Sequence, residues 1–295
     1  MSFVVTVIAH GDALRSEKEL VDRVVGALDA ELIKTETLSK RAVDIFVKAP
    51  GEVLQLKQKL DQLDVDDADL AVQVVDEQLQ RRPLKLCVFD MDSTLIYQEV
   101  IELIAAYAGV EPQVHEITER AMNNEIDFKQ SLRERVRLLK GLKIDNLYEE
   151  IKQKLQITEG VPQLCSTLKQ HGIKLAVLSG GFIQFASYIK DQLSLDYARA
   201  NLLEMDDSGV LTGEVIGEIV DGQCKAETIK QLCKDWSIDL ENVCMIGDGG
   251  NDLPSMHVSG YGIAWNAKPT VQKQAPSKLN TKSLADALYI FGIIE

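Results

Sequence analysis

The stretch LKLCVFDMDST, residues 84–94, decides the fold class of this chain. Residues 84–89 form a short and nearly continuous apolar run, which is typical of a parallel strand buried on both faces. Comparable runs follow at residues 173–178, 243–246 and 261–265. Segments whose apolar residues recur at helical spacing lie between them, at residues 161–170, 182–193 and 226–235. Buried strands that alternate with helices predict an α/β fold built on a doubly wound parallel sheet.

A long insertion separates the first of these strands from the second. Residues 99–154 carry no strand pattern, and their apolar spacing predicts helices at residues 100–109, 114–122, 128–139 and 147–154. Because the chain must leave the sheet after the first strand and return to it for the second, we expect these helices to form a lid over the sheet. Farther on, the turn at residues 206–209 between apolar flanks predicts a small hairpin.

The first 80 residues follow a different pattern, which predicts a domain of their own. Strand patterns at residues 3–9, 32–38, 43–47 and 70–75 are interrupted by helical patterns at 17–28 and 53–63. The order β-α-β-β-α-β predicts a ferredoxin-like α+β domain, in which two helices cover one antiparallel sheet. The polar segment 76–83, which ends in proline, predicts a linker. We therefore expect a domain at residues 1–80 that can be removed from a second domain at residues 84–295.

Composition and charge narrow the range of partners. The 295 residues carry 32 basic and 46 acidic side chains, a net charge of −14 at pH 7, and no basic run offers a patch for a polyanion. Nucleic acid and anionic membranes are therefore poor candidates. No apolar stretch is long enough to span a bilayer, and the N-terminus lacks the features of a signal peptide. The five scattered cysteines favour free thiols in a reducing cytoplasm over a disulfide framework or a zinc site.

Reactive side chains follow three of the predicted strands at the point where each strand ends. Asp90 and Asp92 follow the first, SGG at residues 179–181 follows the second, and GDGGND at residues 247–252 follows the third. In an open parallel sheet the carboxyl ends of the strands share one edge, so these groups converge. Asp90 by itself is equally well explained as a helix N-cap. Asp248, a third carboxylate at the same edge, favours a site for a hard cation with oxygen ligands, which suits Mg²⁺.

Two further features favour a phosphate ligand. The hydroxyl of Ser179 and the following glycine N–H groups stand at the start of a predicted helix, where phosphate oxygens bind, although a plain tight turn has the same pattern. Lys225 precedes the helix predicted at 226–235, a place where a cation is unfavourable unless an anion is near, although a solvated surface lysine is the simpler explanation. Competing motifs are missing: the sequence has no G-x-x-x-x-G-K-[ST], no G-x-S-x-G and no H-E-x-x-H, and residues 247–252 match a dinucleotide motif only in part.

Taken in order, residues 90–94, residues 179–181, Lys225 and residues 247–252 resemble the four motifs of the haloacid dehalogenase superfamily of aspartyl-phosphate phosphatases. The resemblance runs from about residue 84 to residue 275. Within the insertion, the residues Glu99, Met122, Phe128 and 131–136 are similar to the lid of the phosphoserine phosphatases in this superfamily. Some of these enzymes carry N-terminal extensions related to ACT domains, and residues 1–80 resemble such an extension in the order of their elements.

This resemblance implies a role for each matching residue of the catalytic and metal sites. Asp90 is implied as the nucleophile that forms an aspartyl-phosphate, and Asp92 as the general acid and base. Mg²⁺ is implied as the cofactor, held by Asp90, Asp248 and the backbone carbonyl of Asp92. Asp252 is implied as a partner of Lys225 or of a metal-bound water.

The resemblance also implies how a substrate is held. The phosphoryl oxygens are implied to contact Ser179, Gly180, Lys225 and Asn251. In the lid, Arg135 is implied to bind a carboxylate and Glu99 an ammonium group. Without the resemblance, an exposed helix face is the simpler explanation of the charges of residues 133–135.

The implied activity is Mg²⁺-dependent hydrolysis of O-phospho-L-serine to L-serine and phosphate, the last step of serine biosynthesis. Two alternatives stay open: another phosphatase or phosphotransferase of the same superfamily that acts on a different small ester, and a non-enzymatic aspartyl-phosphate switch. Asp92 argues against the switch, because a long-lived acyl phosphate has no use for a general acid. The implied partners are a small-molecule substrate, an amino-acid effector at residues 1–80 and a second copy of the chain in a homodimer.

Overall fold

The computed structural model describes residues 1–63, 65, 67–122, 125–144 and 146–294. A seven-stranded sheet forms its larger part, in the order β11-β10-β9-β5-β6-β7-β8. Its strands are β5 (Leu86–Phe89), β6 (Lys174–Phe182), β7 (Tyr197–Met205), β8 (Leu211–Ile216), β9 (Val243–Gly247), β10 (Tyr261–Trp265) and β11 (Ser277–Leu279). All neighbours pair in parallel except β7 and β8, which form the hairpin expected around residues 206–209. The predicted α/β fold class is confirmed.

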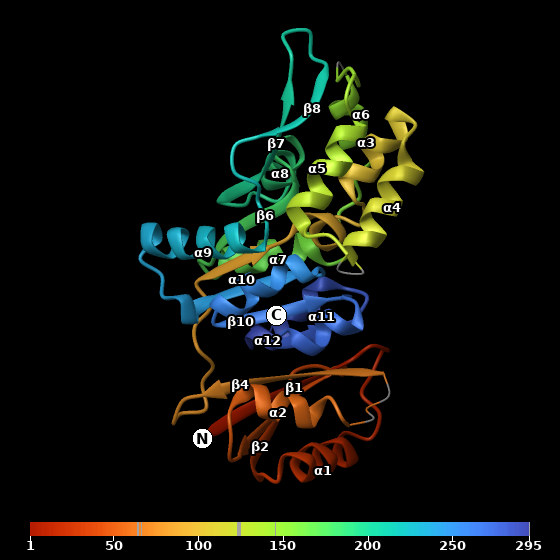
Figure 1. The fold of residues 1–295 in the computed structure, drawn as a ribbon. Coiled ribbons are helices and arrows are strands. Elements are labelled where there is room, and N and C mark those ends of the chain that lie inside the picture. The colour runs from red at the N-terminus through yellow and green to blue at the C-terminus, as the bar shows by residue number, and fades with distance from the viewer. Residues whose placement is uncertain (64, 66, 123–124, 145, 295) are drawn as a thin grey trace.

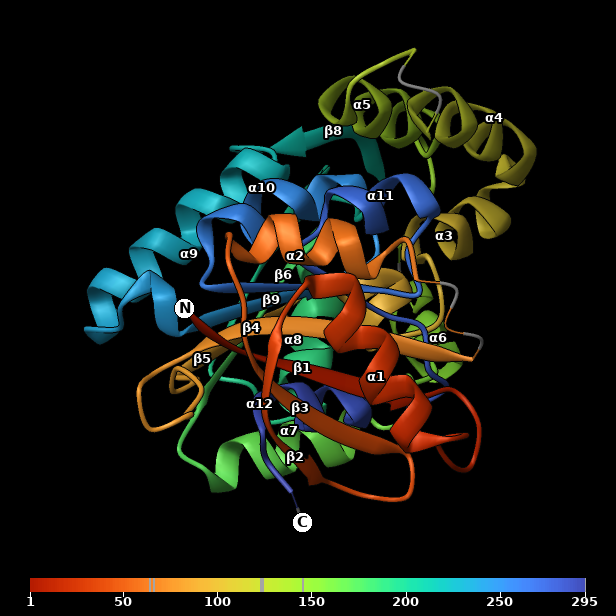
Figure 2. The same ribbon diagram turned by 90° about the horizontal axis from the view of Figure 1, so that it is seen from below.

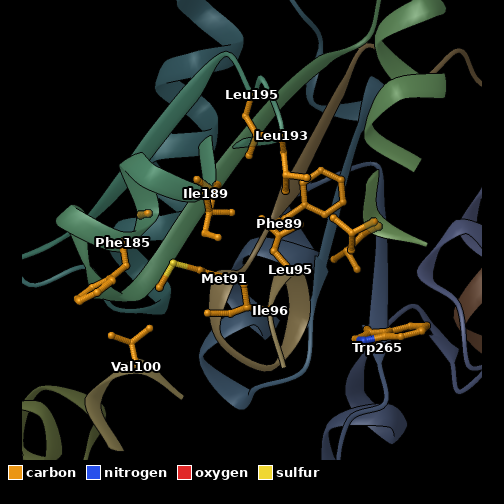
Figure 3. Close-up of a cluster of buried hydrophobic side chains, with 14 of the residues drawn as sticks. Phe89, Met91, Leu95, Ile96, Val100, Phe185, Ile189, Leu193, Leu195 and Trp265 are labelled. Carbon is orange, nitrogen blue, oxygen red and sulfur yellow. The ribbon is translucent and has the colours of Figure 1, made fainter. Parts of the chain in front are cut away.

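The central strand β5 shows why its sequence is apolar at successive positions. Cys87 and Phe89 belong to a buried cluster on one face of the sheet, whereas Leu86 and Val88 belong to a second cluster on the other face. Figure 3 shows Phe89 in the first cluster, together with Ile189 and other side chains. The helices that complete the domain are α7 (Val161–Gln170), α8 (Ile183–Gln192), α9 (Gly222–Trp236), α10 (Leu253–Val258), α11 (Pro269–Gln274) and α12 (Ala287–Phe291).

Four helices fill the insertion between β5 and β6. They are α3 (Val100–Ala108), α4 (Glu111–Met122), α5 (Phe128–Leu138) and α6 (Leu147–Lys154), close to the predicted ranges. Together with the β7–β8 hairpin they form one end of the molecule (Figure 1). The hairpin packs against the lid closely, since a Cβ atom added to Gly213 of β8 would lie 3.0 Å from Cβ of Lys140.

The first residues form a four-stranded antiparallel sheet at the opposite end of the molecule, seen from below in Figure 2. Its elements are β1 (Ser2–Ala9), α1 (Glu17–Leu28), β2 (Glu31–Thr37), β3 (Ala42–Lys48), α2 (Val53–Leu60) and β4 (Ala68–Val75). The strand order β2-β3-β1-β4 is that of a ferredoxin-like fold. The predicted ferredoxin-like class is confirmed.

The small sheet packs tightly against the larger domain, although the polar segment between them predicted two separate domains. Ile8, Ala42 and Ala71 belong to the same buried cluster as the core of the larger sheet. Arg41 donates two hydrogen bonds to Asp286, at 2.9 and 2.7 Å. Removal of residues 1–80 would therefore uncover apolar surface and break a partly buried ion pair, so we expect the second domain to aggregate when they are deleted.

The segment expected to be a linker is also anchored. Arg81 pairs with Val75 through an isolated β-bridge and donates hydrogen bonds to Asp44 Oδ1 at 2.6 Å and Thr6 Oγ1 at 2.8 Å. Asp44 is 1% exposed, so this ion pair is shielded from solvent. The chain therefore folds back onto the small sheet before it enters β5.

The structure bears on two further expectations, which concern the cysteines and membrane-spanning segments. All five cysteines are free thiols and all are buried. Among the residues that the structure describes, no helix is long and apolar enough to cross a membrane.

Candidate active site

The side chains expected at the carboxyl ends of the strands do meet at one edge of the sheet. Asp90 follows β5 directly, and Asp248 follows β9. Carboxylate oxygens of Asp90, Asp248 and Asp252 all lie within 4.8 Å of one another. The first two were expected as metal ligands, and Asp252 was expected as a partner of Lys225 or of a metal-bound water. Asp252 joins the group because the short turn η3 (Gly250–Asp252) folds its side chain back under Gly249, whose N–H donates to Asp252 Oδ2 at 3.1 Å.

Asp90 is held by contacts on two sides. Its Oδ1 atom accepts a hydrogen bond from the N–H of Met91 at 2.7 Å, so the side chain does cap the turn η1 (Met91–Leu95), as the simpler explanation proposed. The same oxygen lies 3.0 Å from Nζ of Lys225. A cap alone does not account for a buried lysine, so Asp90 serves more than the turn.

Like Asp252, Lys225 is a fully buried charge at the site. Its side chain is 0% exposed and its Nζ lies 2.7 Å from Asp252 Oδ1, on the other side from Asp90. The sequence analysis predicted that the helix after Lys225 starts at Ala226. In the structure α9 already begins at Gly222. Asp221 caps this helix by accepting a hydrogen bond from the N–H of Cys224 at 2.8 Å. Lys225 therefore stands in the first turn of the helix, where two carboxylates offset the unfavourable helix dipole.

Burial sets the protonation of the carboxylates. Burial, and then the charge of Asp252, raise the pKa of Asp90 to about 7, while Lys225 acts in the opposite direction. Burial also raises the pKa of Asp92 and of Asp248 well above the usual value, and the neighbouring charges of Glu99 and Asp90 add to this effect. Burial opposes the charge of Lys225, yet Asp252 and Asp90 together raise the pKa of its ammonium group.

Such a group of crowded carboxylates fits a divalent cation. Like charges this close disfavour one another, and one lysine balances only part of them. A hard cation with carboxylate and carbonyl ligands would relieve the repulsion, and Mg²⁺ prefers such ligands. Thr94 supports the arrangement, because its hydroxyl donates to Asp248 Oδ1 at 3.2 Å, a contact that the sequence analysis did not foresee.

The turn after the core of β6 lies beside these carboxylates. Ser179 is 0% exposed, and its Oγ accepts a hydrogen bond from the N–H of Gly181 at 2.8 Å. A Cβ atom on Gly181 would lie 2.6 Å from Asp92 Oδ2, and one on Gly180 would lie 3.7 Å from Nδ2 of Asn251. Glycine at position 181 therefore lets the backbone approach Asp92 this closely, whereas the distance from Gly180 to Asn251 is an ordinary van der Waals contact.

The lid contributes side chains to the same place. A Cβ atom on Gly180 would lie 2.6 Å from Cζ of Phe128, so the start of α5 lies against the turn of β6. Arg135 follows Phe128 by about two helical turns and therefore shares its face of the helix. Burial lowers the pKa of Arg135, and the carboxylates of Glu99, Asp92 and Glu102 act in the opposite direction.

Glu99 stands at the base of the lid, immediately before α3. Ser93 has a left-handed φ of 55°, and its hydroxyl donates to Glu99 Oε1 at 2.7 Å. Burial raises the pKa of Glu99, which the hydrogen bond from Ser93 and the charge of Arg135 oppose. Glu99 and Arg135 thus lie within electrostatic reach of each other and of Asp92. The side chain of Met122, the remaining candidate in the lid, lies outside the described residues.

Comparisons with known proteins agree with this geometry. A family model for haloacid dehalogenase-like hydrolases matches residues 84–260. The phosphoserine phosphatase of Saccharomyces cerevisiae is 61% identical over 300 residues, which cover 98% of this chain and 96% of the relative. A crystal structure of a probable phosphoserine phosphatase from Vibrio cholerae covers 99% of this chain and 87% of its own, with a TM-score of 0.72 and 34% identity. A substrate-bound phosphoserine phosphatase structure covers 71% of this chain and 99% of its own, with a TM-score of 0.67 and 40% identity.

Proposed function

The chain belongs to the haloacid dehalogenase-like hydrolases, and we propose that within this family it hydrolyses O-phospho-L-serine to L-serine and phosphate, the last step of serine biosynthesis. One observation carries the proposal: the carboxylate of Asp90 lies 3.0 Å from a fully buried lysine, beneath a lid that brings Arg135 and Glu99 toward Asp92. Asp90 and the buried lysine suit a phosphoryl group. Arg135 and Glu99 have the opposite charges that a zwitterionic substrate needs.

Asp90 is proposed as the nucleophile. Its carboxylate oxygen attacks phosphorus in line with the serine oxygen, the phosphorus–serine oxygen bond breaks, and an aspartyl-phosphate forms. Lys225 supports this role because its ammonium group, 3.0 Å from Asp90 Oδ1, favours the ionised carboxylate against the effect of burial. Water then attacks the aspartyl-phosphate, and phosphate leaves Asp90.

Asp92 is proposed as the general acid and base. Burial and the neighbouring charges of Glu99 and Asp90 raise its pKa well above the usual value, which favours the protonated form that a general acid needs. This proton goes to the serine oxygen as the ester bond breaks, and the resulting carboxylate takes a proton from the attacking water.

Mg²⁺ is proposed as the cation of the carboxylate group. Asp90, Asp248 and the backbone carbonyl of Asp92 would hold it, while Asp252 is already bonded to Lys225. When bound, the ion supplies positive charge that allows a carboxylate and a phosphate dianion to approach each other.

The remaining residues are proposed to bind substrate. Ser179, Gly180, Lys225 and Asn251 would hold the phosphoryl oxygens by hydrogen bonds and charge. Arg135 would bind the α-carboxylate through its planar donors, and Glu99 would accept hydrogen bonds from the ammonium group. The contact of Phe128 with the turn at Gly180 supports a closed lid that keeps water from the reacting atoms.

Two further proposals concern residues 1–80. A cavity of about 450 Å³ lies between residues 11–16 and the start of β4, and it offers room for an amino-acid effector. The second proposal is a contact between two copies of the chain. Strand β2 is exposed along its length and lies at the edge of the small sheet, which favours pairing with β2 of a second copy. The effector proposal is tested by the shift in Tm that L-serine causes in a variant whose active site cannot bind it. The pairing of β2 is tested by the molecular mass of the protein in solution.

Phosphate release from a matched set of esters tests the function. O-phospho-L-serine, phosphoethanolamine, which lacks the carboxylate, and an aryl phosphate are compared with and without Mg²⁺. We expect phosphoserine to have the highest kcat/KM and turnover to require the cation. Faster release from an ester that lacks either charged group would show that another phosphate ester is the substrate. A single, stoichiometric phosphorylation without release would show a switch.

A further inference from the structure

Strand β6 departs from regular pairing at the turn that is proposed to hold the phosphoryl group. Leu178 pairs with Arg199 of β7, and the next paired residue of β6, Phe182, faces Asn201. Residues 179–181 of β6 therefore stand opposite residue 200 alone, so they bulge out of the ladder. The backbone groups of such a bulge need partners from outside the sheet.

Asn201 provides one of these partners, and it uses both ends of its amide. Its Nδ2 donates to the carbonyl oxygen of Gly180 at 2.8 Å, and its Oδ1 accepts from the N–H of Val220 at 2.8 Å. A carbonyl can only accept and an N–H can only donate, so these two neighbours fix the orientation of the amide. The side chain is 1% exposed, which shields both hydrogen bonds from water.

These two backbone groups belong to different parts of the proposed site. Gly180 lies in the turn with Ser179. Val220 immediately precedes Asp221, which caps α9, and the first turn of α9 carries Lys225. One buried amide thus fixes the spacing between the turn of β6 and the start of the helix that positions the lysine.

We propose that Asn201 is a positioning residue for the phosphoryl group: it holds the Ser179–Gly180 turn and the start of α9 at the separation that a phosphoryl group requires. This inference rests on the proposed function, because it assigns the turn and Lys225 to phosphoryl binding. The turn touches the lid at Phe128, but Glu99 and Arg135, which are proposed to bind the serine end of the substrate, come from other elements than the two that Asn201 joins. Loss of the amide should therefore weaken phosphoryl binding selectively.

Loss of Asn201 would act through its two backbone partners. The carbonyl of Gly180 and the N–H of Val220 would be left buried without partners, and both would move to find new ones. A displacement of about 1 Å at a site that binds a transition state can cost roughly 100-fold in rate. We therefore expect Asn201→Leu, which is similar in size but whose side chain cannot form hydrogen bonds, to raise the dissociation constant of orthovanadate roughly 10- to 100-fold and to lower kcat.

Ser277→Ala is a matched control. Ser277 is also 1% exposed, and its Oγ donates to the backbone carbonyl of Gly262 at 3.0 Å, but it lies in β11 at the other edge of the sheet. Both substitutions remove hydrogen bonds between a buried side chain and the backbone, two at Asn201 and one at Ser277. For both variants and the unmodified protein, with Mg²⁺ present, calorimetry measures orthovanadate binding and inhibition assays measure the competition by L-serine. Thermal unfolding measures Tm.

We expect both variants to lose stability, and only Asn201→Leu to lose orthovanadate affinity and kcat, with L-serine inhibition unchanged. If Asn201→Leu loses stability but keeps orthovanadate affinity and kcat, or if L-serine affinity falls as far as orthovanadate affinity, the proposal is wrong. Should Asn201→Leu not fold, Asn201→Ser, measured in the same way, decides between these outcomes. Orthovanadate binding is measured without turnover, so this result does not depend on the identity of the substrate. If phosphoserine is not the substrate, the unmodified protein will release no phosphate from it.

Discussion

Replacement of Arg135 by alanine tests the step that selects the substrate. Burial lowers the pKa of this guanidinium group, and the carboxylates of Glu99, Asp92 and Glu102 oppose the shift, so the positive charge is half-buried among acidic groups. In such surroundings, truncation of one member of a hydrogen-bonded charge pair costs about 2–5 kcal/mol. Each ~1.4 kcal/mol is a factor of ten, so kcat/KM for phosphoserine should fall by roughly 30-fold to a few thousand-fold.

The assay compares phosphoserine with phosphoethanolamine, which has a similar leaving group but no carboxylate. Arg135→Ala should lower kcat/KM for phosphoserine by that factor and leave hydrolysis of phosphoethanolamine nearly unchanged, because the groups at Asp90 and Lys225 are untouched. Arg133→Ala is the matched control, since Arg133 lies on the same helix but is exposed. Equal losses on both substrates would show that Arg135 serves the lid rather than the carboxylate. No loss on either would remove the basis for phosphoserine as the substrate.

The remaining predictions concern the catalytic acid, the buried lysine, the pH dependence and the domain contact. Asp92→Asn should slow hydrolysis of phosphoserine far more than that of an aryl phosphate, whose leaving group needs little protonation; equal losses in kcat would contradict a role as general acid. Lys225→Met leaves Asp90 and Asp252 buried without their cation and should cost about 3–5 kcal/mol of unfolding free energy in denaturant titrations, whereas unchanged stability would contradict the ion pairs. The pKa of Asp90 is raised from 3.8 to about 7 on folding, so the folded state binds the extra proton and stability in chelator should fall as pH rises through that range. Tm without metal should therefore be higher at about pH 6 than at about pH 8, and Mg²⁺ should raise it more at the higher pH; a Tm that rises with pH in chelator would refute the shift. Deletion of residues 1–80 should give aggregated protein in size-exclusion chromatography, because Ile8 and Ala71 cover the core of the larger domain; a monomeric, active fragment would contradict this.

Much of the fold could be predicted from the sequence because burial on both faces leaves a clear pattern. In β5 every residue is buried, so a continuous apolar run identifies a central strand without any knowledge of its neighbours. The parallel order then brings Asp90 and Asp248 to one edge, as the structure shows. The lid helices were predicted for a similar reason, since their apolar faces recur at helical spacing.

Other features depend on contacts between residues far apart in sequence, and local patterns do not report these. Arg81 lies in a polar segment that resembles a linker, yet its partner Asp44 is 37 residues away. Asn201 is one of several polar residues in β7, and its sequence position does not reveal that its amide bonds to the carbonyl of Gly180 in the bulge of β6. The start of α9 was missed for a local reason: Asp221 is a good N-cap, but the glycine after it obscured the helix.

Identification of the phosphorylated residue during turnover tests the proposed chemistry itself. The protein is mixed with O-phospho-L-serine and Mg²⁺, quenched in acid within one turnover and digested, and the peptides are analysed by mass spectrometry. We predict a phosphate on Asp90 that disappears as inorganic phosphate is released and that is absent from Asp90→Asn. A phosphate on Ser93 or Ser179, or steady turnover with no phosphorylated Asp90, would contradict the aspartyl-phosphate mechanism.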